Sequence, residues 1–265
     1  MLWDFDGTLG QRRTGRWGAC LLQLLDRELP AHEITREVLS PHLQRMFPWH
    51  DHHLEHPHLS EPARWWQHIN GLLAGALAGA GLPSADADRV VTTGFRQLYL
   101  HPDEWELYPD AIPALAAVNE AGARNVIVSN HVPELPDLID HLGLADLVDV
   151  VITSAIVGAE KPHPAIFRAA LAAVDFPDRV WIVGDNPVAD IAGAARLGIP
   201  GVLVRAPDFT PDYVDRINRS YAGTDWLDWA EHCQVRAESL VDSADLILTK
   251  LAGPASAARS GRCAR

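Results

Sequence analysis

The spacing of apolar residues changes twice along the chain. After a short apolar start at residues 1–9, apolar residues from about Arg16 to His101 recur every three or four positions, as in Leu21, Leu24 and Leu25. This period is typical of helices that bury one face. The segment is therefore predicted to form four helices without strands.

From Tyr108 onward, short apolar runs alternate with helical patterns. The predicted strands are Asn125–Ser129, Leu147–Thr153, Val180–Gly184 and Gly201–Val204. The predicted helices are Asp110–Ala121, Leu135–Leu142, Pro164–Val174 and Ala189–Leu197. Alternating strands and helices with nearly continuous apolar strands are typical of a parallel sheet covered on both faces. We therefore predict an α/β fold with a Rossmann-like, three-layer core of residues 1–9 and 108–251. Residues 10–107 would form an inserted all-helical cap, and residues 252–265 a disordered tail.

Composition narrows the class of protein. The 265 residues suffice for a sizeable core. The formal net charge of -13 would repel a phosphate backbone, which argues against a nucleic-acid partner. The three cysteines are far apart, which favours a reducing, cytoplasmic environment over a disulfide framework. The most apolar stretch, residues 69–82, is shorter than the roughly 20 residues that span a bilayer, so no membrane association is expected.

The N-terminal strand is short. Only Met1, Leu2 and Trp3 precede Asp4, whereas a buried parallel strand usually has about five or six residues. The strand that carries Asp4 is expected in the middle of the sheet, where missing residues would leave backbone groups unpaired. We therefore expect the true start of the protein to lie upstream, unless neighbouring side chains or water satisfy those groups.

Polar clusters follow the predicted strands. Ser129 and Asn130 follow one, and the segment Asp185–Asp190 follows another. In open α/β sheets, ligands bind at the carboxyl ends of the strands, so these clusters should share one crevice. Asp4 and Asp6 would join them after the first strand, although two acids beside a glycine also occur in ordinary turns. With Lys161, the whole set suits a divalent cation and a phosphoryl group, to which Ser129 and Asn130 can donate hydrogen bonds.

Four motifs resemble those of the haloacid dehalogenase superfamily and follow one another along the chain in the same order. They are Asp4-Phe5-Asp6-Gly7-Thr8, Ser129-Asn130, Lys161 and Asp185–Asp190. The resemblance spans residues 1 to about 205, and the helical insertion resembles that superfamily's C1 cap. It implies that Asp4 is a nucleophile that forms an aspartyl-phosphate and also ligates Mg²⁺. Asp6 would protonate the leaving group and then activate water, with its backbone carbonyl on the metal.

The resemblance implies roles for the other motif residues as well. Asp185 would be the remaining carboxylate ligand of Mg²⁺. Thr8 and Ser129 would hydrogen-bond the phosphoryl oxygens, and Lys161 would offset the charge of nucleophile and phosphate. Asp190 would orient Lys161 or a water on the metal.

The acid at position 6 selects among the reactions of this superfamily. Displacement of halide needs no proton donor, whereas cleavage of a phosphate ester does, and the dehalogenase branch lacks this acid. We therefore predict a Mg²⁺-dependent phosphatase acting on a small phosphorylated metabolite, of unknown oligomeric state. A sugar phosphomutase and a catalytically silent binding protein on the same scaffold are the alternatives.

Other residues allow two interpretations each. Arg12, Arg13 and Arg16 could bind a second anionic group of the substrate, or belong to a solvated hinge loop. His131 could contact substrate or have a structural role.

Two cap segments also resemble ligand sites. The histidine-rich segment 48–58 is predicted to be a solvated cap loop rather than a metal site, because its spacing matches no ordered ligand set. Trp65 and Trp66 are predicted to pack in the cap core and at its seam with the α/β core rather than to hold a cofactor.

Overall fold

The α/β core is built on a six-stranded parallel sheet. The computed structural model describes residues 1–44, 47–221 and 228–252. The strand order is β5-β4-β1-β6-β7-β8, so the short β1 lies between β4 and β6. The strands are β1 (Leu2–Trp3), β4 (Val126–Ser129), β5 (Val150–Thr153), β6 (Ile182–Gly184), β7 (Gly201–Val204) and β8 (Arg236–Ala237). The four strands predicted after residue 108 are all present, and the predicted fold class is confirmed.

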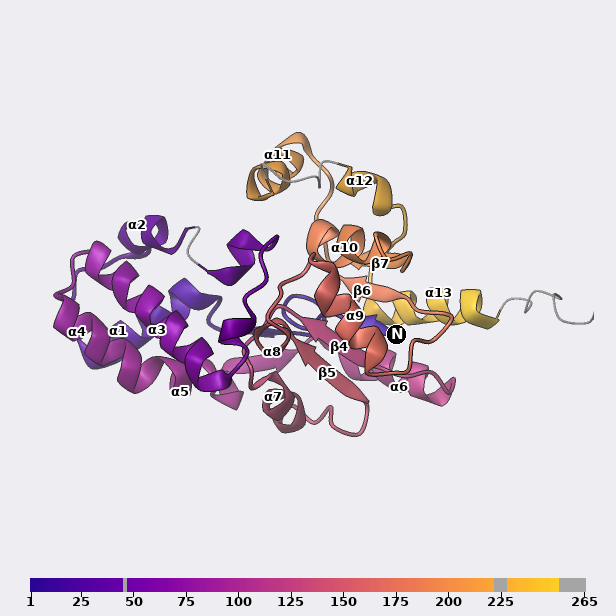
Figure 1. Cartoon of the computed structure of the whole chain (residues 1–265), viewed down its shortest axis with the longest axis horizontal. Coiled ribbons are helices and arrows are strands. Elements are labelled where there is room, and N and C mark those ends of the chain that lie inside the picture. The colour runs from indigo at the N-terminus through magenta and orange to yellow at the C-terminus, as the bar shows by residue number, and fades with distance from the viewer. Residues whose placement is uncertain (45–46, 222–227, 253–265) are drawn as a thin grey trace, which may run out of the picture.

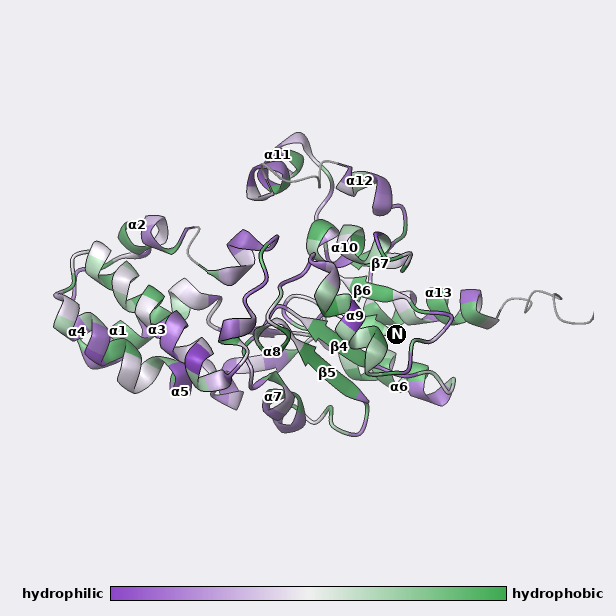
Figure 2. Cartoon of the chain, viewed as in Figure 1, coloured by the Kyte–Doolittle hydropathy of each residue, from purple (hydrophilic) through white to green (hydrophobic). Residues whose placement is uncertain are grey.

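Helices cover both faces of the sheet (Figure 1). Side chains alternate between the faces, so that Leu2 packs into one buried cluster and its neighbour Trp3 into the other. The cluster that contains Trp3 includes residues of α6 (Ala111–Glu120), α7 (Leu135–His141) and α13 (Leu240–Ala252) and continues into the cap. The elements packed with Leu2 include α9 (Pro164–Ala172), a π-helical turn (Pro187–Ala192), α10 (Gly193–Ala195), α11 (Pro211–Ser220) and α12 (Trp229–His232). The strands β4 and β5 are strongly hydrophobic, as a doubly covered sheet requires (Figure 2).

The cap is a helical bundle beside the core (Figure 1). Its helices are α1 (Trp17–Glu28), α2 (Arg36–Leu39), α3 (Pro62–Gly79), α4 (Ser84–Val90) and α5 (Arg96–Tyr99), with short 3-10 helices at Ser40–Leu43, Pro48–Asp51 and Pro57–Leu59. Trp65 and Trp66 are buried, and the Trp66 indole donates a hydrogen bond to Glu134 of the core at 2.9 Å. Their predicted places in the cap core and at its seam are confirmed.

Several elements differ from the sequence predictions. The two chain segments between core and cap form an antiparallel pair, β2 (Gly10–Arg12) with β3 (Trp105–Leu107), which the helical pattern does not show. The helix expected at Ala189–Leu197 begins earlier, at Pro187, and its first turns are π-helical. The short helix α8 (Ser154–Val157) and every element after β7 were not predicted. The predicted disordered tail lies, apart from Ala252 at the end of α13, outside the described residues.

Two observations bear on the expectations from composition. Cys20 and Cys233 are buried and free, and Cys263 lies outside the described residues. In the described ranges, no helix combines the length and the apolar character needed to cross a membrane.

Candidate active site

The polar residues predicted to share a crevice do meet at one edge of the sheet. Asp4 follows β1, Ser129 ends β4 and Asp185 follows β6, and these three strands are neighbours. Lys161 joins them from the loop between α8 and α9. They line a cavity of about 200 Å³ that also touches Asp6 and residues of the cap. The topology of a parallel sheet explains why residues so far apart in sequence converge.

The carboxylate of Asp4 accepts hydrogen bonds from three side chains of the site. It is 5% exposed. Its Oδ1 accepts hydrogen bonds from Ser129 Oγ at 2.8 Å and from Lys161 Nζ at 2.7 Å. Its Oδ2 accepts only a longer bond, from Thr8 Oγ1 at 3.3 Å. One carboxylate oxygen is therefore neutralised and fixed, while the other keeps most of its capacity to react or to bind a cation.

Lys161 is held in place from two sides. Its ammonium group bridges Asp4 and Asp190, and it lies 2.5 Å from Asp190 Oδ1. Burial alone would lower the pKa of Lys161, but the two carboxylates outweigh this effect and raise the pKa above its usual value. The Asn130 amide accepts from the Lys161 backbone N–H at 2.6 Å and donates to its carbonyl at 3.0 Å. Asn130 therefore positions Lys161, and its predicted contact with a phosphoryl group stays a prediction.

The turn after β6 places Asp190 against Lys161. The Asn186 side chain accepts hydrogen bonds from the backbone N–H groups of Val188 and Ala189 and so caps the turn Pro187–Ala192. Asp190 Oδ2 in turn accepts from the Asn186 backbone N–H at 2.9 Å. A Cβ on Gly184 would lie 2.3 Å from Asp190 Oδ2. The close approach of Asp190 to β6 thus requires glycine at this position.

Asp6 and Asp185 are carboxyl groups with perturbed pKa values. Burial raises the pKa of Asp6 to about 6, and the charge of Asp4 adds to the effect while Arg16 and Lys161 oppose it. Burial, followed by repulsion from Asp4 and Asp190, raises the pKa of Asp185 well above its usual range. Gly7 has φ +99, and a Cβ there would lie 2.6 Å from Asp185 Oδ2. A glycine is thus needed to bring the two acidic segments this close.

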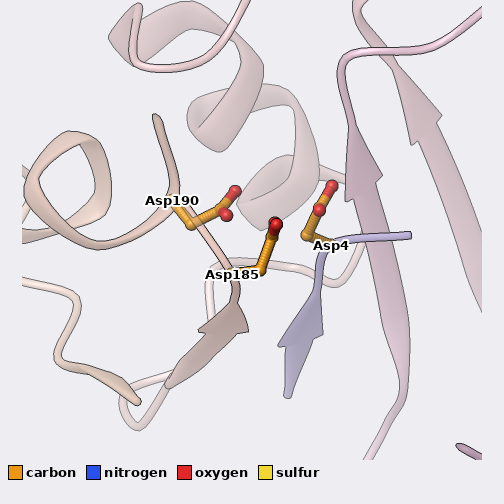
Figure 3. A group of neighbouring side chains, drawn as sticks. All are labelled: Asp4, Asp185 and Asp190. Atoms are coloured by element: carbon orange, nitrogen blue, oxygen red, sulfur yellow. The ribbon is translucent and has the colours of Figure 1, made fainter. Parts of the chain in front are cut away.

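The donor set fits a hard divalent cation. Carboxylate oxygens of Asp4, Asp185 and Asp190 lie within 4.8 Å of one another, and Figure 3 shows the three groups converging. Both Asp190 oxygens already bind Lys161 and Asn186, whereas no described cation forms an ion pair with Asp185. Oxygen ligands with unbalanced negative charge are what Mg²⁺ prefers. Asp4 and Asp185 are therefore the residues best placed to hold Mg²⁺.

The three arginines after the first motif do not act together. Arg12 is buried and pairs with Glu104 at 3.2 Å, and Arg13 pairs with Glu106 at 2.8 Å on the surface. Arg16, just before α1, lines the cavity and lowers the pKa of Asp6 through its charge. The sequence could not separate the three, because their spacing gives no sign of which ones pair with acids near β3. Only Arg16 remains a candidate for contact with an anion of the substrate.

His131 packs in an aromatic cluster at the boundary of cap and core. It is 5% exposed, and its ring centroid lies 5.7 Å from Phe5 and 5.2 Å from Trp105. Burial lowers the pKa of His131 to about 4. The residue does not line the cavity. These surroundings favour the structural interpretation over contact with substrate.

The prediction of a solvated histidine-rich loop was wrong for two residues. His52 and His56 are buried, and the ring of His52 lies 4.9 Å from that of Tyr221. His56 Nε2 lies 3.3 Å from the buried Glu160 Oε1, and the His56 backbone N–H donates to Gly158 at 2.7 Å. Among the described residues, the group arranged to hold a metal is the aspartate cluster and not these histidines. The loop thus links the cap to the segment that carries Lys161.

Sequence reasoning missed several residues that line the cavity. They are Trp17, Trp49, Asn186 and Tyr221. Asn186 lay inside the fourth motif, where an N-cap signal before a helix could have identified it. The aromatic residues carry no local signal, since their role depends on how cap and core pack.

Comparison with known proteins agrees with this geometry. A family model described as haloacid dehalogenase-like hydrolase matches residues 1–198. The mouse haloacid dehalogenase-like hydrolase domain-containing protein 3 is 32% identical over 143 residues, which are 53% of this chain and 55% of that protein. The phosphoserine phosphatase of Thermus thermophilus is 34% identical over 145 residues, which are 52% of this chain and 57% of that protein. The chain thus spans little more than half the length of these relatives.

A solved structure shows the same fold. The 2-haloacid dehalogenase of Pseudomonas syringae superimposes with a TM-score of 0.61 over 95% of this chain and 98% of that one, at 22% sequence identity. At this identity the likeness concerns the fold alone. The reaction therefore has to be argued from the residues of the site.

Proposed function

Because this chain belongs to the haloacid dehalogenase-like hydrolase family, we propose that it is a Mg²⁺-dependent phosphatase that forms an aspartyl-phosphate on Asp4. The observation that carries the proposal is the pairing of Asp4 Oδ1 with Ser129 Oγ and Lys161 Nζ, with Asp6 two residues further on. Similarity to a phosphoserine phosphatase supports phosphate esters as the substrate class. The small cavity under the cap favours a small phosphorylated metabolite.

In the first step, an oxygen of Asp4 attacks phosphorus and the bond from phosphorus to the leaving oxygen breaks. Asp6 donates its proton to that oxygen, for which a pKa of about 6 is well suited. Ser129 and Lys161, which hold Asp4 in the free protein, are close enough to donate to the phosphoryl oxygens. Mg²⁺, held by Asp4 and Asp185, would supply positive charge beside these groups.

In the second step, Asp6 is ionised and acts as the base. It takes a proton from a water molecule, whose oxygen attacks phosphorus, and the bond from phosphorus to Asp4 breaks. Inorganic phosphate leaves, Asp4 is restored as a carboxylate and Asp6 is protonated again. Asp190 and Asn130 keep Lys161 in place throughout, since each binds it directly.

The experiment is release of inorganic phosphate from phosphate monoesters, with Mg²⁺ and after chelation by EDTA. Asp4→Asn should reduce turnover by at least about 10³-fold, because it removes the covalent route. Asp178→Asn, which changes an exposed carboxylate, is the matched control and should match the parent. Turnover of Asp4→Asn within a few-fold of the parent, or turnover unaffected by EDTA, would refute the proposal.

A further inference from the structure

Part of the lining of the cavity that holds the carboxylate cluster is aromatic. Its lining includes the rings of Trp17, Trp49 and Tyr221, which together we call the aromatic end. Trp17 begins α1, Trp49 lies in the 3-10 helix Pro48–Asp51, and Tyr221 follows α11. Two segments of the cap and one of the core therefore contribute rings to the same space.

The two indoles are fixed by other rings behind them. Trp49 stacks on Phe47 with centroids 4.4 Å apart and an angle of 8° between the planes. Trp17 stacks on Tyr99, also at 4.4 Å, and Trp17 and Trp49 lie 5.4 Å apart. Rings held in this way lose little conformational entropy when a ligand packs on them. The aromatic end is thus preorganised.

Tyr221 is the residue that the core contributes to the aromatic end. It belongs to the segment between β7 and β8, which is anchored in the core by the buried Trp229. Its ring lies 4.9 Å from His52 of the cap, and its hydroxyl lies 3.5 Å from Asn186 Oδ1. Tyr221 therefore contacts both the cap and the catalytic turn after β6.

The two ends of the cavity differ in chemistry. The phosphoryl group is drawn to the end with Lys161 and Ser129, which leaves the aromatic end to the remainder of the substrate. A small aliphatic leaving group offers these rings little surface to pack on, whereas a flat ring can stack on them. We propose that the aromatic end binds the leaving group of the substrate and selects leaving groups with a planar, unsaturated ring. This proposal rests on the proposed phosphatase function.

The test compares three phosphate monoesters whose leaving alcohols have similar basicity: benzyl, cyclohexylmethyl and ethyl phosphate. Because the chemical step is matched, differences in kcat/KM report how the leaving group is bound. The parent should prefer benzyl over ethyl phosphate by about tenfold or more, and benzyl over the equally bulky cyclohexylmethyl ester by at least about threefold. Equal kcat/KM for the benzyl and cyclohexylmethyl esters would overturn the proposal.

Two variants on separate elements locate the effect. Trp49→Leu and Tyr221→Leu should each reduce the preference for benzyl over ethyl phosphate by about threefold to tenfold, the usual worth of one aromatic pair. Phe209→Leu is the control, because Phe209 belongs to the same segment as Tyr221 but packs on Trp229, at 5.0 Å, outside the cavity. An unchanged preference in both variants would overturn the proposal.

A binding measurement separates this proposal from the phosphatase function. Benzylphosphonate cannot be hydrolysed, and its affinity relative to ethylphosphonate can be measured by calorimetry with the parent, Tyr221→Leu and Phe209→Leu. A preference for the benzyl compound that is lost only in Tyr221→Leu supports the aromatic end even if no ester is hydrolysed. Turnover of ethyl phosphate together with equal affinities for the two phosphonates overturns the aromatic end and leaves the phosphatase function standing.

Discussion

Lowering the pH from 7 to 5 should cost this protein about 2 kcal/mol of folding free energy through His131 alone. Burial lowers the pKa of His131 from 6.5 to about 4 in the folded protein. As the pH falls through this interval, the unfolded chain binds a proton that the folded protein does not bind. The stabilisation is therefore complete above about 6.5 and is lost as the pH approaches 4.

The magnitude follows from the two pKa values. One pKa unit corresponds to about 1.4 kcal/mol, so the whole interval is worth about 3.4 kcal/mol. Between pH 7 and pH 5 the unfolded chain becomes almost fully protonated at this histidine while the folded protein stays neutral, which accounts for about 2 kcal/mol. His131→Phe keeps a ring among Phe5, Tyr99 and Trp105 but cannot titrate.

The assay is urea unfolding followed by tryptophan fluorescence at pH 7, 6 and 5, in EDTA, for the parent and His131→Phe. The comparison is needed because the pKa values of Asp6, Asp185 and Asp190 are raised, so these groups add stability as the pH falls. That contribution is common to both proteins and cancels in their difference. A difference in unfolding free energy that stays constant within about 0.5 kcal/mol from pH 7 to 5 would refute the reasoning.

Three further predictions concern the catalytic cluster. Mg²⁺ at about 100 times its dissociation constant should stabilise the parent by about 2.7 kcal/mol, which thermal unfolding shows as a higher Tm. Asp185→Asn should show no such increase in Tm. In EDTA this variant should be more stable than the parent, because a repulsive charge is gone. Gly184→Ala should lower both Tm and the rate of phosphate release, because its Cβ would lie 2.3 Å from Asp190. The control Gly71→Ala, which has open space around it in α3, should raise Tm slightly. Equal effects of the two substitutions would contradict the steric argument. Asn130→Ala should lower kcat about 10-fold to 100-fold in steady-state kinetics with a smaller change in KM, because it releases the backbone of Lys161. A change confined to KM would instead indicate that Asn130 contacts the substrate directly.

The convergence of the catalytic residues could be predicted from the sequence. Asp4, Ser129 and Asp185 each stand at the end of an apolar run, and parallel strands bring such ends to one edge whatever the details of packing. The prediction was thus independent of side-chain geometry. The hydrogen-bond partner of each side chain could not be predicted in the same way. Asn130 is an example, because it binds the backbone of Lys161, in a loop that has no periodic pattern.

The contacts between cap and core escaped prediction for a different reason. The burial of His56 against Glu160 and the place of Tyr221 beside His52 depend on how two separately patterned segments pack on each other. Polar and aromatic residues in loops have no period that reveals such packing. The same holds for Arg12, for which the sequence allowed a substrate contact or a solvated hinge loop, whereas the structure buries it in an ion pair with Glu104.

The central position of β1 has a consequence for biosynthesis. Its two neighbours, β4 and β6, begin at Val126 and Ile182, so β1 emerges from the ribosome long before either partner exists. The cap helices, whose contacts are mostly local, can form in the meantime, but the sheet cannot close around Leu2 and Trp3 until more than half of the chain has been made. The nascent chain therefore carries Asp4 next to an apolar segment that has no strand partners until β4 and β6 have been made.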